Sequence, residues 1–193
     1  MRADGQSDVH FRVAAPDDWE PVRRIRLAAL TAEPQCFGHA LTQDQALTEV
    51  DWRESLAVNR WILAEAETEI VGLVALFLAD TYPDGAPQLG SMWVAPRMRR
   101  RGLARELERE IAALAMSLGF ARLGLWITEG NSAAASAYEA LGYASSGDRK
   151  PAPRDDSVLM HRWLRTLVVP AFEPRAIRGD SDGPARSPGA PRP

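Results

Sequence analysis

One stretch of the sequence constrains the fold more than any other, because an apolar strand, an arginine-rich loop and an amphipathic helix follow one another directly. The strand is predicted over residues 88–94, and the loop after it contains four arginines before Gly102. The helix is predicted over residues 102–118, with Gly119 as its C-cap. Its apolar stripe consists of Leu103, Leu107, Ile111, Leu114 and Leu118. A buried strand follows over residues 123–127, so this part of the chain predicts a mixed α/β sheet.

The flanking segments extend this sheet at both ends. On the N-terminal side the predicted elements are a strand (9–14), a helix (16–30), a loop (31–41), a second helix (43–57), a hairpin of two strands (60–65 and 69–78) and a turn (82–87). On the C-terminal side they are a helix (131–141), a short strand (143–146), a loop (147–156) and a last strand (158–163). We therefore expect one domain over residues 8–171, a flexible N-terminus over 1–7 and a disordered Pro-, Gly- and Arg-rich tail over 172–193.

The composition excludes several classes of protein. The chain has 193 residues and a formal net charge of −3, which argues against a dedicated nucleic-acid binder, since such proteins are normally basic. Its single cysteine, Cys36, excludes an internal disulfide framework and a multi-cysteine zinc site. The histidines His10, His39 and His161 lack ligand spacing, so no metal site is expected.

The hydropathy pattern predicts a cytoplasmic protein with no membrane partner. The longest apolar run, residues 70–79, is too short to span a bilayer. The first ten residues are polar and lack the apolar core of a signal peptide. Lys150 is the only lysine, so an anion site in this chain must use guanidinium groups, backbone N–H groups or both.

The arginine-rich loop has the chemistry of a phosphate-binding site. A helix that begins in a glycine-containing loop directs unpaired N–H groups at one point, and its dipole favours an anion there. Gly102 permits a close backbone approach, and Ala104 keeps the first helical turn small. We interpret the loop as a pyrophosphate cradle. An arginine cluster considered alone is more often a solvated basic loop. The chain contains neither Gly-Lys-Ser/Thr nor Gly-x-Gly-x-x-Gly, which excludes the two commonest phosphate loops.

A second group of residues lies on the helix predicted over 131–141. Asn131 and Tyr138 are seven residues apart, which places them on one helix face two turns from each other. The alanines between them leave a shallow groove in which a long, thin ligand can lie. Taken singly, Asn131 is an ordinary N-cap and Tyr138 a partly buried packing residue.

The two groups in this order resemble the GCN5-related N-acetyltransferase (GNAT) family. The pattern V-x-P-x-x-R-x-x-G-x-A is matched by Val94, Pro96, Arg99, Gly102 and Ala104. The pattern N-x-x-A-x-x-x-Y-x-x-x-G-Y is matched by Asn131, Ala134, Tyr138, Gly142 and Tyr143. The resemblance covers roughly residues 88–143. It implies a mixed α/β fold: a mostly antiparallel sheet of about six or seven strands with a central splayed parallel pair, flanked by about four helices.

The resemblance implies acetyl-CoA as the co-substrate, bound where the two parallel strands separate, with no metal. The N–H groups from Arg99 to Ala104 would bind its pyrophosphate, Asn131 its pantetheine arm, and an N–H near Val94 would polarise the thioester carbonyl. The residues expected to contact acetyl-CoA are Met92, Trp93, Val94, Arg99, Arg100, Arg101, Gly102, Leu103, Ala104, Arg105, Asn131 and Tyr138.

The resemblance also implies direct attack of a neutral amine on the thioester, without a covalent enzyme intermediate. Tyr138 would donate a proton to the departing sulfur, because a phenol is protonated at neutral pH. Glu129 is the predicted base for the incoming ammonium, with Glu65 or a water chain to the surface as alternatives. Cys36 is then a small loop residue rather than a nucleophile.

The acceptor is expected between the first two helices and the strands opposite them. Acidic residues in this region would form a rim that attracts a cationic amine, although for most of them a solvated helix face is the simpler interpretation: Glu33, Asp44, Glu49, Asp51 and Glu54. Phe37, Trp52 and Trp93 either line the acceptor cleft or belong to the core.

These expectations lead to one preferred function and two alternatives. The preferred function is N-acetylation of a small-molecule amine, with no nucleic acid as a partner. The alternatives are a protein acetyltransferase acting on an N-terminus or a lysine, and a non-catalytic acyl-CoA-binding module on the same fold. The family often dimerises, and the strand predicted over residues 158–163 is a candidate for a homodimer interface.

Overall fold

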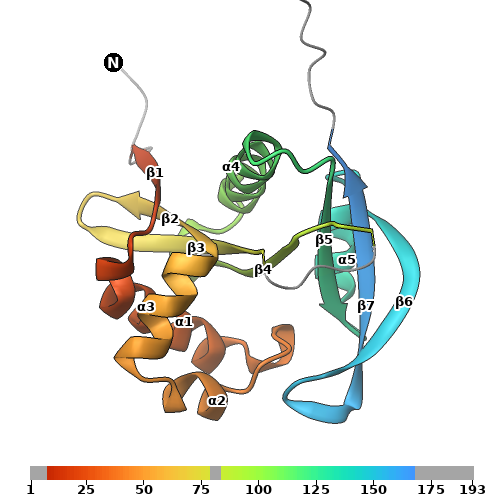
Figure 1. Cartoon of the computed structure of the whole chain (residues 1–193), viewed down its shortest axis with the longest axis horizontal. Coiled ribbons are helices and arrows are strands. Elements are labelled where there is room, and N and C mark those ends of the chain that lie inside the picture. The colour runs from red at the N-terminus through yellow and green to blue at the C-terminus, as the bar shows by residue number, and fades with distance from the viewer. Residues whose placement is uncertain (1–7, 79–83, 168–193) are drawn as a thin grey trace, which may run out of the picture.

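A single twisted sheet organises the part of the chain that this computed structural model describes, residues 8–78 and 84–167 (Figure 1). Its strands are β1 (Val9–Val13), β2 (Arg60–Ala66), β3 (Glu69–Phe77), β4 (Gln88–Val94), β5 (Arg122–Thr128), β6 (Ala144–Ala152) and β7 (Asp155–Thr166). They are ordered β1-β2-β3-β4-β5-β7-β6 across the sheet. Every neighbouring pair is antiparallel except β4–β5, which is parallel. This confirms the predicted fold class.

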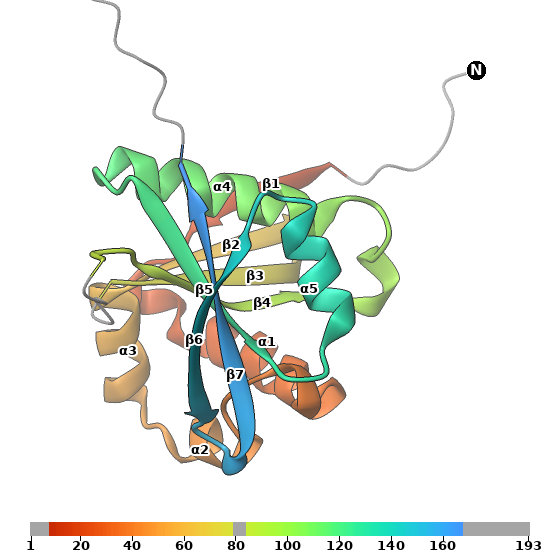
Figure 2. The same cartoon turned by 90° about the vertical axis from the view of Figure 1, so that its right-hand side faces the viewer.

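Five α-helices accompany the sheet within the described ranges: α1 (Trp19–Ala32), α2 (Leu41–Ala46), α3 (Glu49–Val58), α4 (Leu103–Ser117) and α5 (Ser132–Glu139). Short 3-10 turns, η1 (Pro16–Asp18), η2 (Pro34–Cys36) and η3 (Pro96–Met98), precede α1, α2 and α4. Helices α1, α2 and α3 lie on one side of strands β2–β4, and α4 lies on the other (Figures 1 and 2). Strands β5, β7 and β6 run steeply across the direction of β2–β4 (Figure 2).

The parallel pair at the centre of the sheet is short. Strands β4 and β5 are in register only at Gln88 with Gly124 and at Leu89 with Leu125. A side-chain carbon at Gly124 would lie 2.7 Å from the Gln88 amide, so a larger residue there would force the Gln88 side chain to move. Beyond Leu89 the strands diverge, and no described strand pairs with the backbone of β4 on that side. The splayed parallel pair is therefore present.

Strand β4 also contains a bulge just after this point. Leu73 of β3 is opposite Trp93 and Ala75 is opposite Gly90, so Ser91 and Met92 of β4 together face the single residue Val74 of β3. One of them, Ser91, has a φ of 54°, which is rare for a residue other than glycine. Such a bulge bends the strand and turns its backbone groups away from the ladder.

Helix α4 follows the predicted stripe except at its end. Leu107 and Ile111 are fully buried, whereas Leu118 is 43% exposed because the helix stops at Ser117. Glu108 of the same helix is also fully buried, which the pattern of apolar residues did not predict.

Two predicted boundaries were wrong. The helix predicted over residues 43–57 is two helices, because Thr48 forms an N-cap: its Oγ1 accepts a hydrogen bond from the Asp51 N–H (3.3 Å), and the Asp51 carboxylate accepts one from the Thr48 N–H (2.7 Å). The loop predicted over residues 147–156 is instead a β-hairpin, in which β6 extends to Ala152 and β7 begins at Asp155. Most of β6 is exposed on both faces, so the alternation that marks a half-buried strand is absent.

Within residues 8–78 and 84–167, no helix has the length and apolar character needed to cross a membrane. The same ranges contain no group of three or more His, Cys, Asp or Glu side chains that could hold a metal ion. The predicted flexible N-terminus and the predicted tail lie outside the described residues.

Candidate active site

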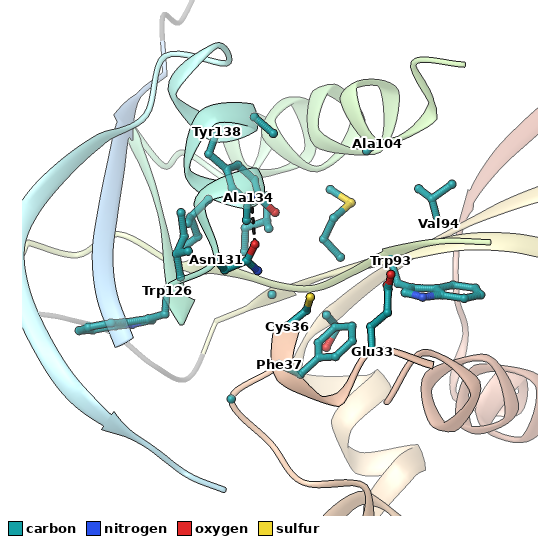
Figure 3. A pocket seen from close by; sticks show the side chains of 18 of the residues that line it. Glu33, Cys36, Phe37, Trp93, Val94, Ala104, Trp126, Asn131, Ala134 and Tyr138 are labelled. Atoms are coloured by element: carbon teal, nitrogen blue, oxygen red, sulfur yellow. Dashed lines mark hydrogen bonds between the residues drawn. The ribbon is translucent and has the colours of Figure 1, made fainter. Parts of the chain in front are cut away.

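A cavity of about 950 Å³ lies at the point where β4 and β5 diverge (Figure 3). Its walls come from α1 to α3, β4, the start of α4, α5 and the β6–β7 hairpin. Most of the predicted site residues line it: Met92, Trp93, Val94, Arg99, Arg100, Gly102, Leu103, Ala104, Arg105, Asn131 and Tyr138. Two predicted residues, Arg101 and Glu129, are not among the lining residues.

The loop before α4 presents unpaired N–H groups. The Arg99 N–H already donates to the Pro96 carbonyl (3.3 Å), and the N–H of Arg105 donates to the Gly102 carbonyl (2.9 Å). Between them, no described residue accepts a hydrogen bond from the N–H groups of Arg100 to Ala104. Arg100 and Gly102 have φ values of 60° and 86°, a left-handed backbone that curves the loop around these donors. The start of α4 is therefore suited to an anion.

The side chain of Arg99 is bonded within the protein. Its Nε donates to the Val94 carbonyl (2.9 Å), and its Nη1 and Nη2 donate to the two carboxylate oxygens of Glu33 (2.6 and 2.8 Å). Arg97 forms an ion pair with Glu69. Of the four loop arginines, Arg100 is exposed and lines the cavity, so it is the one placed to contact a ligand phosphate through its side chain.

Helix α5 forms the opposite wall. The Oδ1 of Asn131 accepts a hydrogen bond from the Ala134 N–H (3.1 Å) and so caps the helix, as expected from sequence. Both Asn131 and Tyr138 line the cavity (Figure 3). The Tyr138 ring meets the Tyr143 ring edge to face, with 5.4 Å between their centroids and 76° between their planes.

The buried side chain of Glu108 is hydrogen-bonded to one of these two tyrosines. The Glu108 Oε1 accepts hydrogen bonds from the Tyr143 hydroxyl (3.0 Å) and from Nη1 of Arg165 (2.5 Å). Burial, and then the negative charge of Glu108, raise the pKa of Tyr138 well above that of a free phenol. The Tyr138 hydroxyl therefore keeps its proton through the neutral and mildly alkaline range.

The predicted bases do not reach the cavity. The Glu129 side chain is 61% exposed and its carboxylate lies 3.7 Å from Nε2 of His161. Glu65 accepts a hydrogen bond from Nε of Arg12 (2.9 Å) and does not line the cavity either. Cys36 lines the cavity, and partial burial raises the pKa of its thiol, which disfavours a thiolate nucleophile.

The five acidic residues predicted to form a rim do not present free carboxylates to the cavity. Asp44 is 4% exposed and accepts hydrogen bonds from Nε of Arg26 (2.8 Å) and from Nδ1 of His39 (3.1 Å). Burial alone would raise the Asp44 pKa, but these two partners hold it below its usual value. Glu33 is paired with Arg99 as described above. The remaining three, Glu49, Asp51 and Glu54, do not line the cavity.

The aromatic residues serve both roles that the sequence left open. Phe37, Trp52 and Trp93 are 8%, 2% and 8% exposed and also line the cavity. They are joined by Trp61 and Phe77, which sequence reasoning missed; the Trp61 ring centroid lies 6.2 Å from that of Trp52 and 5.9 Å from that of Phe77.

Sequence reasoning also missed Arg26, although a signal was present. Arg26 lies on the helix face formed by Val22, Ile25 and Ala29, at the spacing of a buried stripe. An arginine in such a stripe must have partners in the interior.

Comparisons with known proteins agree with this geometry. The sequence profile of the Acetyltransferase (GNAT) family matches residues 19–143. A GNAT-family acetyltransferase from Streptococcus pneumoniae has a similar structure, with a TM-score of 0.69 and 19% identity over 83% of this chain and 100% of that chain. A GCN5-related N-acetyltransferase from Kribbella flavida gives a TM-score of 0.62 and 18% identity over 82% and 98% of the two chains.

A third similar structure is that of yncA from Salmonella typhimurium, determined with its cofactor acetyl-CoA; it gives a TM-score of 0.65 and 16% identity over 84% and 96% of the two chains. A search of curated proteins found no match. The structural likeness supports the fold, and the sequence profile covers well over half of the chain. The chain therefore belongs to the GNAT family of acetyltransferases.

Proposed function

We propose that the chain is an acetyl-CoA-dependent N-acetyltransferase that acetylates a primary amine of a small molecule by direct attack in a ternary complex. The observation that carries this proposal is the extent of one cavity, which runs from the unpaired N–H groups at the start of α4, past Tyr138, to a wall of buried aromatic side chains. One end suits a phosphate group and the other an organic acceptor.

The residues of the first half fit acetyl-CoA. The N–H groups of Arg100 to Ala104 would hold the pyrophosphate, with Arg100 and Arg105 adding charge. The unpartnered edge of β4 and the Asn131 side chain would hold the pantetheine arm. Bound acetyl-CoA supplies an activated acetyl group as a thioester.

The chemical step then depends on two features of the protein. The bulge at Ser91 turns backbone groups of β4 away from β3. The N–H of Val94, near the end of the same strand, is the group expected to polarise the thioester carbonyl. The Tyr138 hydroxyl holds the proton that the leaving sulfur takes, and its raised pKa keeps that proton in place beforehand.

Deprotonation of the acceptor is assigned to solvent rather than to a side chain. Glu129 and Glu65 both lie outside the cavity lining, and the carboxylates of Glu33 and Asp44 inside it are held by arginines. A small-molecule acceptor is favoured over a protein because the acceptor wall is formed by buried rings such as Trp52 and Trp61.

The proposal is tested by calorimetric titration with acetyl-CoA, followed by a free-thiol assay of CoA release against a panel of primary amines. Micromolar binding and amine-dependent thiol release are expected. Binding without turnover of any amine or peptide would indicate the non-catalytic acyl-CoA module, and turnover of peptides alone would indicate a protein acetyltransferase. No binding would overturn the proposal altogether.

A further inference from the structure

The two carboxylates among the described lining residues, Glu33 and Asp44, are both paired with arginines, so neither is free to bind a cationic amine. Resting on the proposed function, we infer that the acceptor is an amino acid with a large apolar side chain, and that its carboxylate binds at Arg26 of α1. This reverses the expectation of an acidic rim.

The charge of the cavity wall is the first argument. The charged residues that line it comprise five cations and two anions: Arg26, Arg99, Arg100, Arg105 and Lys150 against Glu33 and Asp44. Both anions are neutralised, Glu33 by Arg99 and Asp44 by Arg26. Arg99, Arg100 and Arg105 lie at the phosphate end. At the acceptor end, a polyamine would therefore meet no free carboxylate among the described lining residues.

Unpartnered donors are the second argument. Arg26 is 5% exposed, and Asp44 takes only its Nε, so its Nη1 has no hydrogen-bond partner among the described residues. The indole Nε1 atoms of Trp52 and Trp61 are likewise buried without a partner in that part of the chain. All three groups donate and none accepts. Because a buried donor without a partner is costly, the group that completes this wall is an acceptor, and a carboxylate is the strongest one.

The shape of the same wall indicates the rest of the ligand. The Arg26 guanidinium lies over the Phe37 ring at 4.7 Å, and Trp52, Trp61 and Phe77 follow one another at ring spacings of 6.2 and 5.9 Å. Aromatic walls of this kind bind apolar groups of a ligand. A ligand with a carboxylate for Arg26 and an apolar side chain for the aromatic wall is an amino acid such as tryptophan or phenylalanine.

The experiment compares matched acceptors in the thiol-release assay: tryptophan against tryptamine, phenylalanine against phenethylamine, and phenylalanine amide, which keeps the body but removes the charge. Spermidine represents the cationic class. We expect kcat/KM for the amino acids to exceed that for the decarboxylated amines and the amide by about tenfold or more. Equal or greater rates with the amines or with spermidine would overturn the inference.

Variants locate the effect. Arg26→Lys keeps a cation for Asp44 but removes the free arm of the guanidinium, and Trp52→Phe removes one donor while keeping an aromatic ring. Each should reduce the preference for the amino acid over its amine. Arg12→Lys alters another paired arginine, one that does not line the cavity, and should leave the preference as it is. If neither Arg26→Lys nor Trp52→Phe moves the ratio, the carboxylate does not bind here and the inference fails.

Failure of the inference and failure of the proposed function give different results. If acetyl-CoA binds but no amino acid is acetylated, the cofactor assignment stands and the acceptor inference is overturned. If acetyl-CoA does not bind, the proposed function fails and the inference fails with it.

Discussion

The Arg99 guanidinium donates hydrogen bonds to both carboxylate oxygens of Glu33, at 2.6 and 2.8 Å, and the two residues are 66 positions apart in the sequence. The same guanidinium donates to the carbonyl of Val94 at 2.9 Å. One side chain thus joins three pieces of the cavity: the segment after α1, the end of β4 and the loop before α4. Arg99 therefore shapes the site through its side chain, whereas its motif position suggested a direct phosphate contact.

Glu33→Gln should weaken this link. The pair is bidentate but partly exposed, so we expect the free energy of unfolding to fall by roughly 1 kcal/mol in urea denaturation. Glu69→Gln is the matched control, because the Glu69–Arg97 pair is also near the loop but more exposed. A change below about 0.5 kcal/mol is expected for the control. Equal effects of the two variants would contradict a special role for the Arg99 link.

Gly102→Ala should lower the affinity for acetyl-CoA. A non-glycine residue at a φ of 86° costs about 1–2 kcal/mol, and the loop can relieve that strain only by moving its unpaired N–H groups. Gly119→Ala is a close control: Gly119 has a φ of 88° beyond the other end of α4, no atom lies within 4 Å of the added carbon at either position, and Gly119 does not line the cavity. Calorimetry should show similar losses of stability but a weaker acetyl-CoA affinity for Gly102→Ala alone.

The sequence was sufficient to predict the fold class and the strand–loop–helix unit, and most of the residues that it marked for acetyl-CoA line the cavity, because each depends on local periodicity or on a short motif. The break at Thr48 was also local and was missed only because the T-x-x-D capping signal was not recognised. Strand β6 could not be identified in this way, since its residues are exposed on both faces and its pairing with β7 supplies the only constraint.

The ion pairs between side chains far apart in the sequence could not be predicted from the sequence. The sequence marks Glu33 and Asp44 as acids near the acceptor. Their ion pairs, however, depend on the packing of α1 against α2 and on the approach of the segment after α1 to the loop before α4. A long-range pair of this kind leaves no periodic signal in a single sequence. That is why the sequence alone could not show that these two acids are already paired.

Tyr138→Phe should reduce kcat by about a hundredfold, the usual scale for loss of a general acid, while acetyl-CoA still binds. The ring packing on Tyr143 is retained by phenylalanine, so the free energy of unfolding should change little. Because burial and Glu108 raise the Tyr138 pKa, wild-type turnover should show no loss from this group up to about pH 10. Comparable kcat values for the variant and the wild type would remove Tyr138 as the proton donor.

The buried contact between Glu108 and Tyr143 should behave as a coupled pair. Glu108→Leu leaves the Tyr143 hydroxyl without its acceptor, at a cost of about 1–3 kcal/mol. Adding Tyr143→Phe removes the orphaned hydroxyl, so the double variant should recover that part of the loss, whereas the loss of the Arg165–Glu108 ion pair remains. A double-mutant cycle in urea measures this coupling. Strictly additive losses would show that the two side chains do not depend on each other.

Asp44→Asn should destabilise the fold in a pH-dependent manner. At neutral pH the variant leaves Arg26 buried without its counter-charge, which costs about 3 kcal/mol or more. The native pKa of Asp44 lies below its unfolded value, so the wild-type carboxylate contributes this stability above about pH 4 and loses it as the pH falls through the native pKa. Urea denaturation between pH 7 and pH 3 should therefore show a constant gap between wild type and variant down to about pH 5, and a shrinking gap below about pH 4. A gap that stays constant to pH 3 would mean that Asp44 is not the titrating partner of Arg26.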